Sequence, residues 1–380
     1  MKQVSPGRVY YHSLDGIRGF VILLVLFSHN FSFIAYSKFC ESGVDLFFVL
    51  SGFLITEILL TTKKTKNYLQ TFYLRRVLRI FPVYYLALIA FFILAPYCMS
   101  LKEQYSYYES YQFYLWFYLQ NWLPIFHDPP FHDTQILGHF WSLSVEEHFY
   151  IFWPFLILIF KKPKLLTRVC LLILFGFILF RFTTWMIFGN SDINYRLQFN
   201  TRMDGLCIGS LIAIWKFANE NIKIKILKSG LALIVFHLLV AIISKTIFTT
   251  IPHFSLLGYT SISVLFGILI VLAIENKNRI VKTLFEFTPL SYIGKNSYGL
   301  YIYHLPVLVL FRIYFLSSLK KSGLSPLSAN IFIACSAFFV ALLISSISYH
   351  FFEKKILKLK EMIVPGSLEL SFSKKDTNPS

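Results

Sequence analysis

Four side chains that could carry chemistry lie within apolar stretches of the chain. His29 follows Arg18 by eleven residues in one stretch, and Glu146 and Glu147 lie near the start of another, in GHFWSLSVEEHFY. His304 lies in a third, in SYGLYIYHLP. A titratable group in an apolar environment is costly and needs a reason. Since an imidazole oriented by a carboxylate is the usual equipment of a general base, the pattern predicts a catalytic site built on His29 with Glu146 or Glu147.

Helix geometry places these groups at one depth. At a rise of about 1.5 Å per residue, His29 lies roughly 16 Å beyond Arg18, which is about half of a 30 Å hydrocarbon layer. The same arithmetic puts the two glutamates about 10 Å below the outer edge and His304 about 20 Å from the inner edge. Three helices from separate parts of the sequence are therefore expected to contribute to one site.

Structural interpretations of the same residues stay open. A single intramembrane histidine often only hydrogen-bonds a neighbouring helix, and for His304 alone that interpretation is favoured. Glu146 or Glu147 could pair with Arg181 or Arg312, which also lie within apolar stretches.

The composition indicates an integral membrane protein. Of 380 residues, 56% are hydrophobic and only 14% are charged, whereas soluble domains carry about 25% charged residues. The mean hydropathy is +0.61. Intrinsic disorder, a disulfide scaffold and a cytosolic enzyme are excluded. The net charge of +17 would suit nucleic acid in a soluble protein, but here the basic residues lie between apolar stretches, so no nucleic-acid partner is expected.

The five cysteines have no CxxC or zinc-binding spacing, and no metal is expected. Cys40 and Cys98 fall near the same membrane face, but a bridge between them is not favoured.

The apolar stretches predict an all-α polytopic membrane protein with about ten transmembrane helices. Most lysines and arginines then fall in alternate connecting segments, which the positive-inside rule places in the cytoplasm together with both termini. Segment 111–123 is apolar but short and rich in Tyr and Trp, which suits an interfacial or re-entrant position. The expected spans are 19–37, 43–62, 80–98, 140–160, 169–189, 203–218, 228–247, 256–275, 291–316 and 330–352.

One transmembrane domain is expected over 1–360. Within it, 63–79 is a basic amphipathic segment at the inner surface, and 99–139 is an outer loop with an interfacial helix. The polar segment 361–380 is expected to be a disordered cytoplasmic tail. No internal repeat is evident.

Two further groups of charges could bind ligands. Arg76 and Arg79 lie three residues apart and suit phosphate groups, although composition alone favours anionic lipid headgroups. Asp45, Arg202 and Asp204 lie near the outer ends of their spans and could bind a polar substrate, although both aspartates could instead cap helices.

Small residues near these charges are expected to allow close helix packing. They are Ser51, Gly52, Gly205, Gly209 and Ser210.

The sequence resembles the acyltransferase-3 family of bacterial membrane proteins, which acylate envelope and secreted glycans. The resemblance covers about 12–355. It rests on six segments in the family's order: SLDGIRGFVILLVLFSHN, GVDLFFVLSGFLIT, FYLRRVLRIFPVYYLAL, FWSLSVEEHFY, RMDGLCIGSLIA and SYGLYIYHLP. Some members carry an additional C-terminal SGNH-type domain, which is not expected in this chain.

The family's motifs imply roles for particular residues. Its arginine–ten–histidine motif falls on Arg18 and His29, and its fourth-span glutamate falls on Glu146 or Glu147. Its RxxR motif falls on Arg76 and Arg79 and implies contact with cytoplasmic acyl-CoA.

The resemblance implies an O-acyltransferase of the bacterial inner membrane, most simply an O-acetyltransferase with acetyl-CoA as donor. Asp15 and Arg18 would shape the inner entrance for the donor. Asp45, Arg202, Asp204 and His304 would face an acceptor such as O-antigen, exopolysaccharide or a lipid-linked oligosaccharide. Either His29 activates the acceptor hydroxyl directly, or it carries the acyl group itself; both mechanisms stay open.

The rival interpretation is a proton-coupled exporter of an envelope glycan or lipid intermediate, since buried His and Glu also suit a transporter. The lack of an inverted repeat and the RxxR pair disfavour it. A structural assembly subunit would leave the cost of burying His29 unexplained. The sequence does not specify the sugar, the hydroxyl, the acyl chain length or the oligomeric state.

Overall fold

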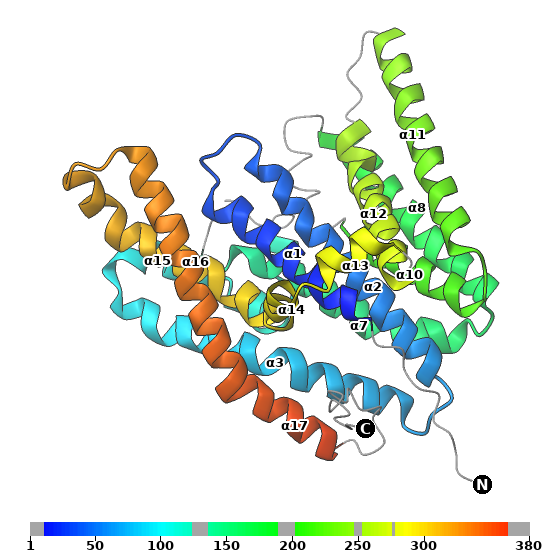
Figure 1. Ribbon diagram of the computed structural model, residues 1–380, viewed down its shortest axis with the longest axis horizontal. Coiled ribbons are helices and arrows are strands. Elements are labelled where there is room, and N and C mark those ends of the chain that lie inside the picture. Colours follow the sequence, from blue (N-terminus) through cyan, green and yellow to red (C-terminus); the bar gives the residue numbers. More distant parts are fainter. Residues whose placement is uncertain (1–10, 124–135, 189–201, 247–252, 276–277, 364–380) are drawn as a thin grey trace, which may run out of the picture.

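The structure is a computed structural model, and it describes residues 11–123, 136–188, 202–246, 253–275 and 278–363. Every regular element within these ranges is helical, as Figure 1 shows. The all-α class is therefore confirmed.

Long helices make up most of the described chain. They are α1 (His12–Asn30), α2 (Gly43–Thr62), α3 (Tyr68–Leu94), α7 (Trp141–Ile159), α8 (Pro163–Phe188), α10 (Asp204–Phe217), α11 (Ile222–Thr246), α12 (His253–Glu275), α15 (Ser297–Lys321) and α16 (Pro326–Ser348). The shorter α-helices are α4 (Lys102–Ser110), α5 (Gln112–Trp116), α13 (Arg279–Phe285), α14 (Thr288–Lys295) and α17 (Lys354–Ile363). Tight 3₁₀ turns are η1 (Ser37–Ser42), η2 (Ala95–Tyr97), η3 (Met99–Leu101), η4 (Gln120–Trp122) and η5 (Gly138–Phe140), and η6 (Tyr349–Glu353) is a π-helical turn.

Seven helices of the described residues are long and apolar enough to cross a membrane. They contain α2, α3, α7, α8, α12, α15 and α16. The chain is thus a multi-pass membrane protein. The other three expected spans overlap α1, α10 and α11. The first was expected over 19–37, whereas α1 covers His12–Asn30. Helix α10 has only 14 residues, fewer than the roughly 20 that cross a bilayer. The count of about ten crossings and the cytoplasmic position of both termini stay predictions.

The basic segment 63–79 does not form a separate helix. Most of it belongs to α3, which runs without interruption from Tyr68 to Leu94 and carries Arg76 and Arg79 in its first half. Once a helix has begun, each further residue adds a hydrogen bond, and no Gly or Pro interrupts this stretch before Pro82. The arginines are therefore rigidly connected to the third expected span.

The outer loop packs against α3. The hydroxyl of Tyr84 donates to the carbonyl oxygen of Leu115 at 2.7 Å, and the hydroxyl of Tyr85 donates to that of Trp116 at 3.0 Å. These bonds fix α5 against the middle of α3. The short apolar segment is held by side chains of a spanning helix, which its sequence did not reveal.

Two predicted segments lie partly outside the described residues. In the outer loop these are residues 124–135, and in the predicted tail they are residues 364–380. Residues 361–363, which the prediction placed in the tail, form the last turn of α17.

All five cysteines are free thiols, so no bridge links Cys40 and Cys98.

Helices α2 and α10 pack backbone against backbone. A Cβ atom on Gly209 would lie 2.0 Å from the carbonyl oxygen of Val49, and one on Gly52 would lie 2.1 Å from that of Leu206. A Cβ atom on Gly205 would also be too close to α2. The predicted packing through small residues is confirmed at these three glycines, and it brings the backbones closer than any side chain would permit.

The first half of α1 is held in the same way by α14. A Cβ atom on Gly294 would lie 1.8 Å from the carbonyl oxygen of Asp15, and one on Gly19 would lie 2.0 Å from that of Leu290. This contact fixes the turn of α1 that carries Arg18.

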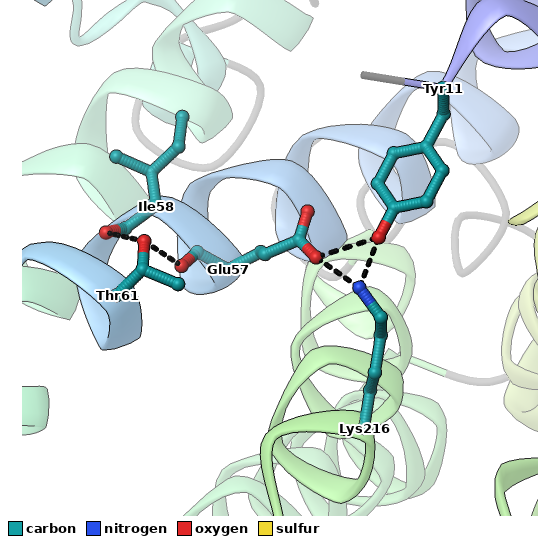
Figure 2. Close-up of polar contacts among 5 residues, drawn as sticks. All are labelled: Tyr11, Glu57, Ile58, Thr61 and Lys216. Atoms are coloured by element: carbon teal, nitrogen blue, oxygen red, sulfur yellow. Dashed lines mark hydrogen bonds and ion pairs between the residues drawn. The ribbon is translucent and has the colours of Figure 1, made fainter. Parts of the chain in front are cut away.

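A polar cluster joins α1, α2 and α10 at one end (Figure 2). The Lys216 ammonium group donates to the hydroxyl of Tyr11 and to the carboxylate of Glu57, and the Tyr11 hydroxyl donates to the same carboxylate at 2.9 Å. Tyr11 directly precedes α1, Glu57 lies on α2, and Lys216 lies in the last turn of α10. The cluster sets where α1 begins relative to the α2–α10 pair.

We expect Gly209→Ala to destabilise the protein. Its methyl group would push α2 and α10 apart, at a cost of about 1–3 kcal/mol. The matched control is Gly176→Ala on α8, where a Cβ atom meets nothing within 4 Å and the better helix propensity of alanine adds up to about 1 kcal/mol. Thermal unfolding in detergent should therefore move in opposite directions for the two variants. Equal stability of both would contradict the close contact.

Candidate active site

The predicted histidines of α1 and α15 are hydrogen-bonded to each other. His29 lies in the last turn of α1, and its Nδ1 atom is 3.0 Å from Nε2 of His304, with the ring planes inclined by 31°. His304 is only 1% exposed, and its Nδ1 atom lies 2.7 Å from the carbonyl oxygen of Tyr301. The structure thus joins two residues that are 275 positions apart in the sequence.

A third histidine, His139, extends this pair. Its ring lies 4.8 Å from that of His304, centroid to centroid, and it is 2% exposed. Its Nε2 atom donates to the carbonyl oxygen of Ile302 at 3.3 Å. Pro306, four residues later, has no N–H group to offer that carbonyl. His139 was not among the residues predicted from the sequence. The proline in YIYHLP was the available indication, because it leaves a backbone carbonyl that needs a donor from another segment.

Hydroxyl groups tie α7 to α15 beside the histidines. The hydroxyl oxygens of Ser142 and Tyr301 lie 2.5 Å apart, and the Tyr301 hydroxyl donates to the carbonyl oxygen of His139 at 2.9 Å. These contacts fix the start of α7 against the turn of α15 that presents His304.

Arg312 stabilises the end of α1. Its guanidinium group donates to the carbonyl oxygen of His29 and to the hydroxyl of Ser32, both at 3.2 Å. A cation at the C-terminal end of a helix interacts favourably with the unpaired carbonyls there. Arg312 therefore bonds the backbone of His29, whose side chain is the predicted base. The sequence had left open a pair between Arg312 and Glu146 or Glu147, and the observed bonds are different ones.

Glu146 faces α2 and the first half of α1. It accepts a hydrogen bond from the hydroxyl of Tyr150 at 3.2 Å, and that hydroxyl is also 2.9 Å from Ser51. Arg76 and Arg18 both lie within electrostatic range of its carboxylate. Glu146 thus lies within electrostatic range of both arginines of the predicted donor site.

Glu147 shares Arg76 with Glu146 as an electrostatic neighbour and also lies near several tyrosines. Tyr84, Tyr118 and Tyr298 are its electrostatic neighbours, and Arg76 is its cationic one. Glu147 is 7% exposed, and its Oε1 atom has no hydrogen-bond partner within the part of the chain that the structure describes. The role of either glutamate toward His29 stays a prediction.

Arg76 and Arg79 have different surroundings. The Arg76 guanidinium group lies 5.7 Å from the ring centroids of both Phe72 and Tyr150, which directs it toward α7. Arg79 is exposed, and Glu353, the last residue of η6, is its electrostatic neighbour. A single anionic ligand could contact both only by extending along α3.

The predicted donor entrance is formed by the first turns of α1. Arg18 Nη1 lies 3.3 Å from Asp15 Oδ1, and both side chains are partly accessible, with 25% and 11% exposure. The spacing of three residues brings these two together as predicted for one helix face.

The outer charges form two ion pairs. Arg202 lies 3.7 Å from Asp45, with its guanidinium group 4.5 Å from the ring centroid of Tyr259. Arg181 donates to Asp204 at 2.8 Å, and both side chains are at most 1% exposed. Arg181 therefore pairs with an aspartate, and not with Glu146 or Glu147 as one interpretation of its sequence allowed. These pairs connect α2, α8, α10 and the segment before α10.

The arrangement suits proton transfer by an imidazole. A neutral imidazole has one N–H group and one lone pair, so hydrogen-bonded rings hold protons at defined nitrogens. Within the described ranges, no group of three or more His, Cys, Asp or Glu side chains is arranged to hold a metal ion. Hydrogen bonds and ring contacts hold the three histidines in place.

A family model described as an acyltransferase domain matches residues 11–350. The chain belongs to this acyltransferase family. It is 29% identical to the peptidoglycan O-acetyltransferase OatA of Listeria monocytogenes, over 92% of this chain and 56% of the relative. It is 28% identical to the O-acetyltransferase OatA of Staphylococcus aureus, over 94% of this chain and 58% of the relative. The acyltransferase chain thus spans little more than half the length of these relatives. No solved structure matches it.

We expect Arg181→Met to destabilise this acyltransferase strongly. Removing one member of a buried ion pair leaves the other charge uncompensated, at a cost of about 3–5 kcal/mol. The double variant Arg181→Met/Asp204→Leu removes both charges and should recover most of that stability. Chemical unfolding in detergent measures both. If Arg181→Met were as stable as the wild type, Asp204 would not depend on Arg181 to balance its charge.

Proposed function

We propose that this chain is an O-acetyltransferase of the bacterial inner membrane that moves an acetyl group from cytoplasmic acetyl-CoA to a sugar hydroxyl of a cell-envelope glycan. One observation carries the proposal: a hydrogen bond between the partly buried His29 and the buried His304 joins two helices in a chain of the acyltransferase family. Burying imidazoles in a membrane protein is costly, and taking the proton from an acceptor hydroxyl group is a function that would explain that cost.

The donor is proposed to bind along the first halves of α1 and α3. Arg76 and Arg79 would bind CoA phosphates at successive positions along α3, since their surroundings differ. Arg18 and Asp15 would flank the path of the thioester toward His29, which lies about 16 Å further along α1. Glu146 lies within electrostatic range of both Arg76 and Arg18 and would attract these guanidinium groups.

The acceptor is proposed to be peptidoglycan or its lipid-linked precursor. The name of the Listeria relative supports this choice over O-antigen and exopolysaccharide. The acceptor would approach from the outer half of the molecule, where the Asp45–Arg202 and Arg181–Asp204 pairs lie. Because these pairs are almost fully buried, we propose that they shape the acceptor side of the site. Arg202 is the residue among them that we propose to contact the acceptor.

The proposed reaction moves the acetyl group from the sulfur of acetyl-CoA to the oxygen of the acceptor hydroxyl. As the acceptor oxygen attacks the thioester carbonyl carbon, its proton moves to His29, and a C–O bond forms. The C–S bond then breaks, and the CoA thiolate takes the proton from His29. In the relay alternative, a nitrogen of His29 attacks the thioester carbon, so that a C–N bond forms and the C–S bond breaks to release the CoA thiolate. The acceptor oxygen then attacks the same carbon, the C–N bond breaks, and the hydroxyl proton goes to the thiolate. A trapped acetyl-histidine that disappears in His29→Ala would favour the relay.

We expect His29→Ala to abolish acetyl transfer while leaving expression and acetyl-CoA binding intact, because the site loses its base. Inside-out vesicles receive radiolabelled acetyl-CoA, and label is followed into glycan and lipid-linked sugar. The matched control is His237→Ala on α11, whose side chain contacts Ser261 and whose helix lies apart from α1 (Figure 1). Label in wild type and control but not in His29→Ala supports the proposal. Absence of label from all three, with native glycans present, would favour the glycan exporter.

We expect Arg76→Ala to raise the KM for acetyl-CoA about tenfold or more, which corresponds to the loss of a charge-assisted contact of roughly 1.5–3 kcal/mol. The matched control is Arg168→Ala, which removes an exposed cation from α8 at a site without a proposed role. Acetyl-CoA binding to purified protein measures both. Equal affinities in the two variants would remove Arg76 from the donor site.

A further inference from the structure

We infer that His304 is a positioning residue that fixes the tautomer of His29, so that Nε2 of His29 is the nitrogen that takes up the proton or the acetyl group. This inference deepens the proposed function and rests on it for the chemistry. It also changes the expectation for His304, which the sequence assigned to acceptor binding.

The chain of hydrogen bonds begins at a backbone carbonyl. The Tyr301 oxygen can only accept, so Nδ1 of His304, at 2.7 Å, must carry a hydrogen. No carboxylate hydrogen-bonds the His304 ring within the described residues, and the ring is 1% exposed. A charged imidazole would be unbalanced there, so the ring is neutral. Its Nε2 atom therefore has the lone pair.

The next bond follows from this assignment. Nε2 of His304 can only accept, so Nδ1 of His29, 3.0 Å away, must donate. A neutral His29 with a hydrogen on Nδ1 has its lone pair on Nε2. The N···N distance of 3.0 Å lies within the range of a normal hydrogen bond.

The surroundings hold His304 in this orientation. Its ring packs against that of His139, which is anchored by its own bond to the carbonyl oxygen of Ile302. Arg312, two turns after His304 on α15, bonds the backbone of His29. Rotation of His304 would break its buried bond to Tyr301, and rotation of either imidazole would break the bond between them, so the tautomer is set before any substrate binds.

The same bond supports His29 during the reaction. When Nε2 takes the proton of the acceptor hydroxyl, His29 becomes an imidazolium ion whose Nδ1–H still donates to His304. In serine proteases the equivalent bond is made by an aspartate, and loss of the correct tautomer there lowers kcat by about 10⁴-fold. Here the accepting group is a neutral imidazole, so His29 is oriented without a second buried charge.

The test compares His304→Leu with His304→Gln. Leucine cannot accept the bond from His29, whereas the Gln amide can accept it through oxygen and still donate through nitrogen. In the vesicle assay, His304→Leu should lower kcat at least about 100-fold, with the KM for acetyl-CoA changed less than about twofold. His304→Gln should retain more activity. In a His29→Ala background, His304→Leu should cause no further loss, because the two residues act as a unit.

A spectroscopic readout separates this inference from the proposed function. With ring-¹⁵N-labelled histidine, the difference between wild type and His29→Ala isolates the His29 signals. We expect the Nδ1–H tautomer in wild type and a shift toward Nε2–H in His304→Leu. An Nε2–H tautomer in wild type, or full activity of His304→Leu beside an active wild type, would overturn the inference. An inactive wild type with the expected tautomer would instead refute the proposed function alone.

Discussion

The hydrogen bond between His29 and His304 depends on the position of two helices relative to each other, and much of the structure serves to fix that position. The backbone contact between Gly294 and the turn at Asp15 holds the start of α1, and Arg312 holds its end. Hydroxyl bonds between Ser142 and Tyr301 hold α15 against α7. Because an N–H···N bond weakens steeply when its distance or angle changes, these distant contacts all bear on one pair of nitrogens.

The cost of burying polar groups explains the organisation of the other charges. The buried Arg181 and Arg202 each lie beside a carboxylate, that of Asp204 and that of Asp45, and aromatic rings cover Arg202. The arginines of the first halves of α1 and α3 are more accessible, with Arg18 one-quarter exposed. Charges that stabilise the fold are thus enclosed, whereas those proposed to bind the donor remain within reach of a ligand.

Prolines contribute to the site through the hydrogen bonds they remove. Pro306 leaves the carbonyl oxygen of Ile302 without its helical donor, and His139 takes that place. The ring of His139 then packs on His304. The hydrogen bond that Pro306 removes from α15 is in this way coupled to the orientation of His304, which positions His29.

The sequence by itself determined the helical class, the membrane character and the membership in the acyltransferase family, because hydropathy and motif spacing are local properties of the chain. It also identified His29 and His304 as unusual, since a polar residue in an apolar stretch is visible without a structure. The tertiary structure decided which groups meet: His304 lies against His29, Arg181 pairs with Asp204, and α3 joins the basic segment to its span. These outcomes depend on how helices rotate and approach one another. That rotation is set by glycine contacts and carbonyl partners from distant parts of the chain, which periodicity along one helix does not encode.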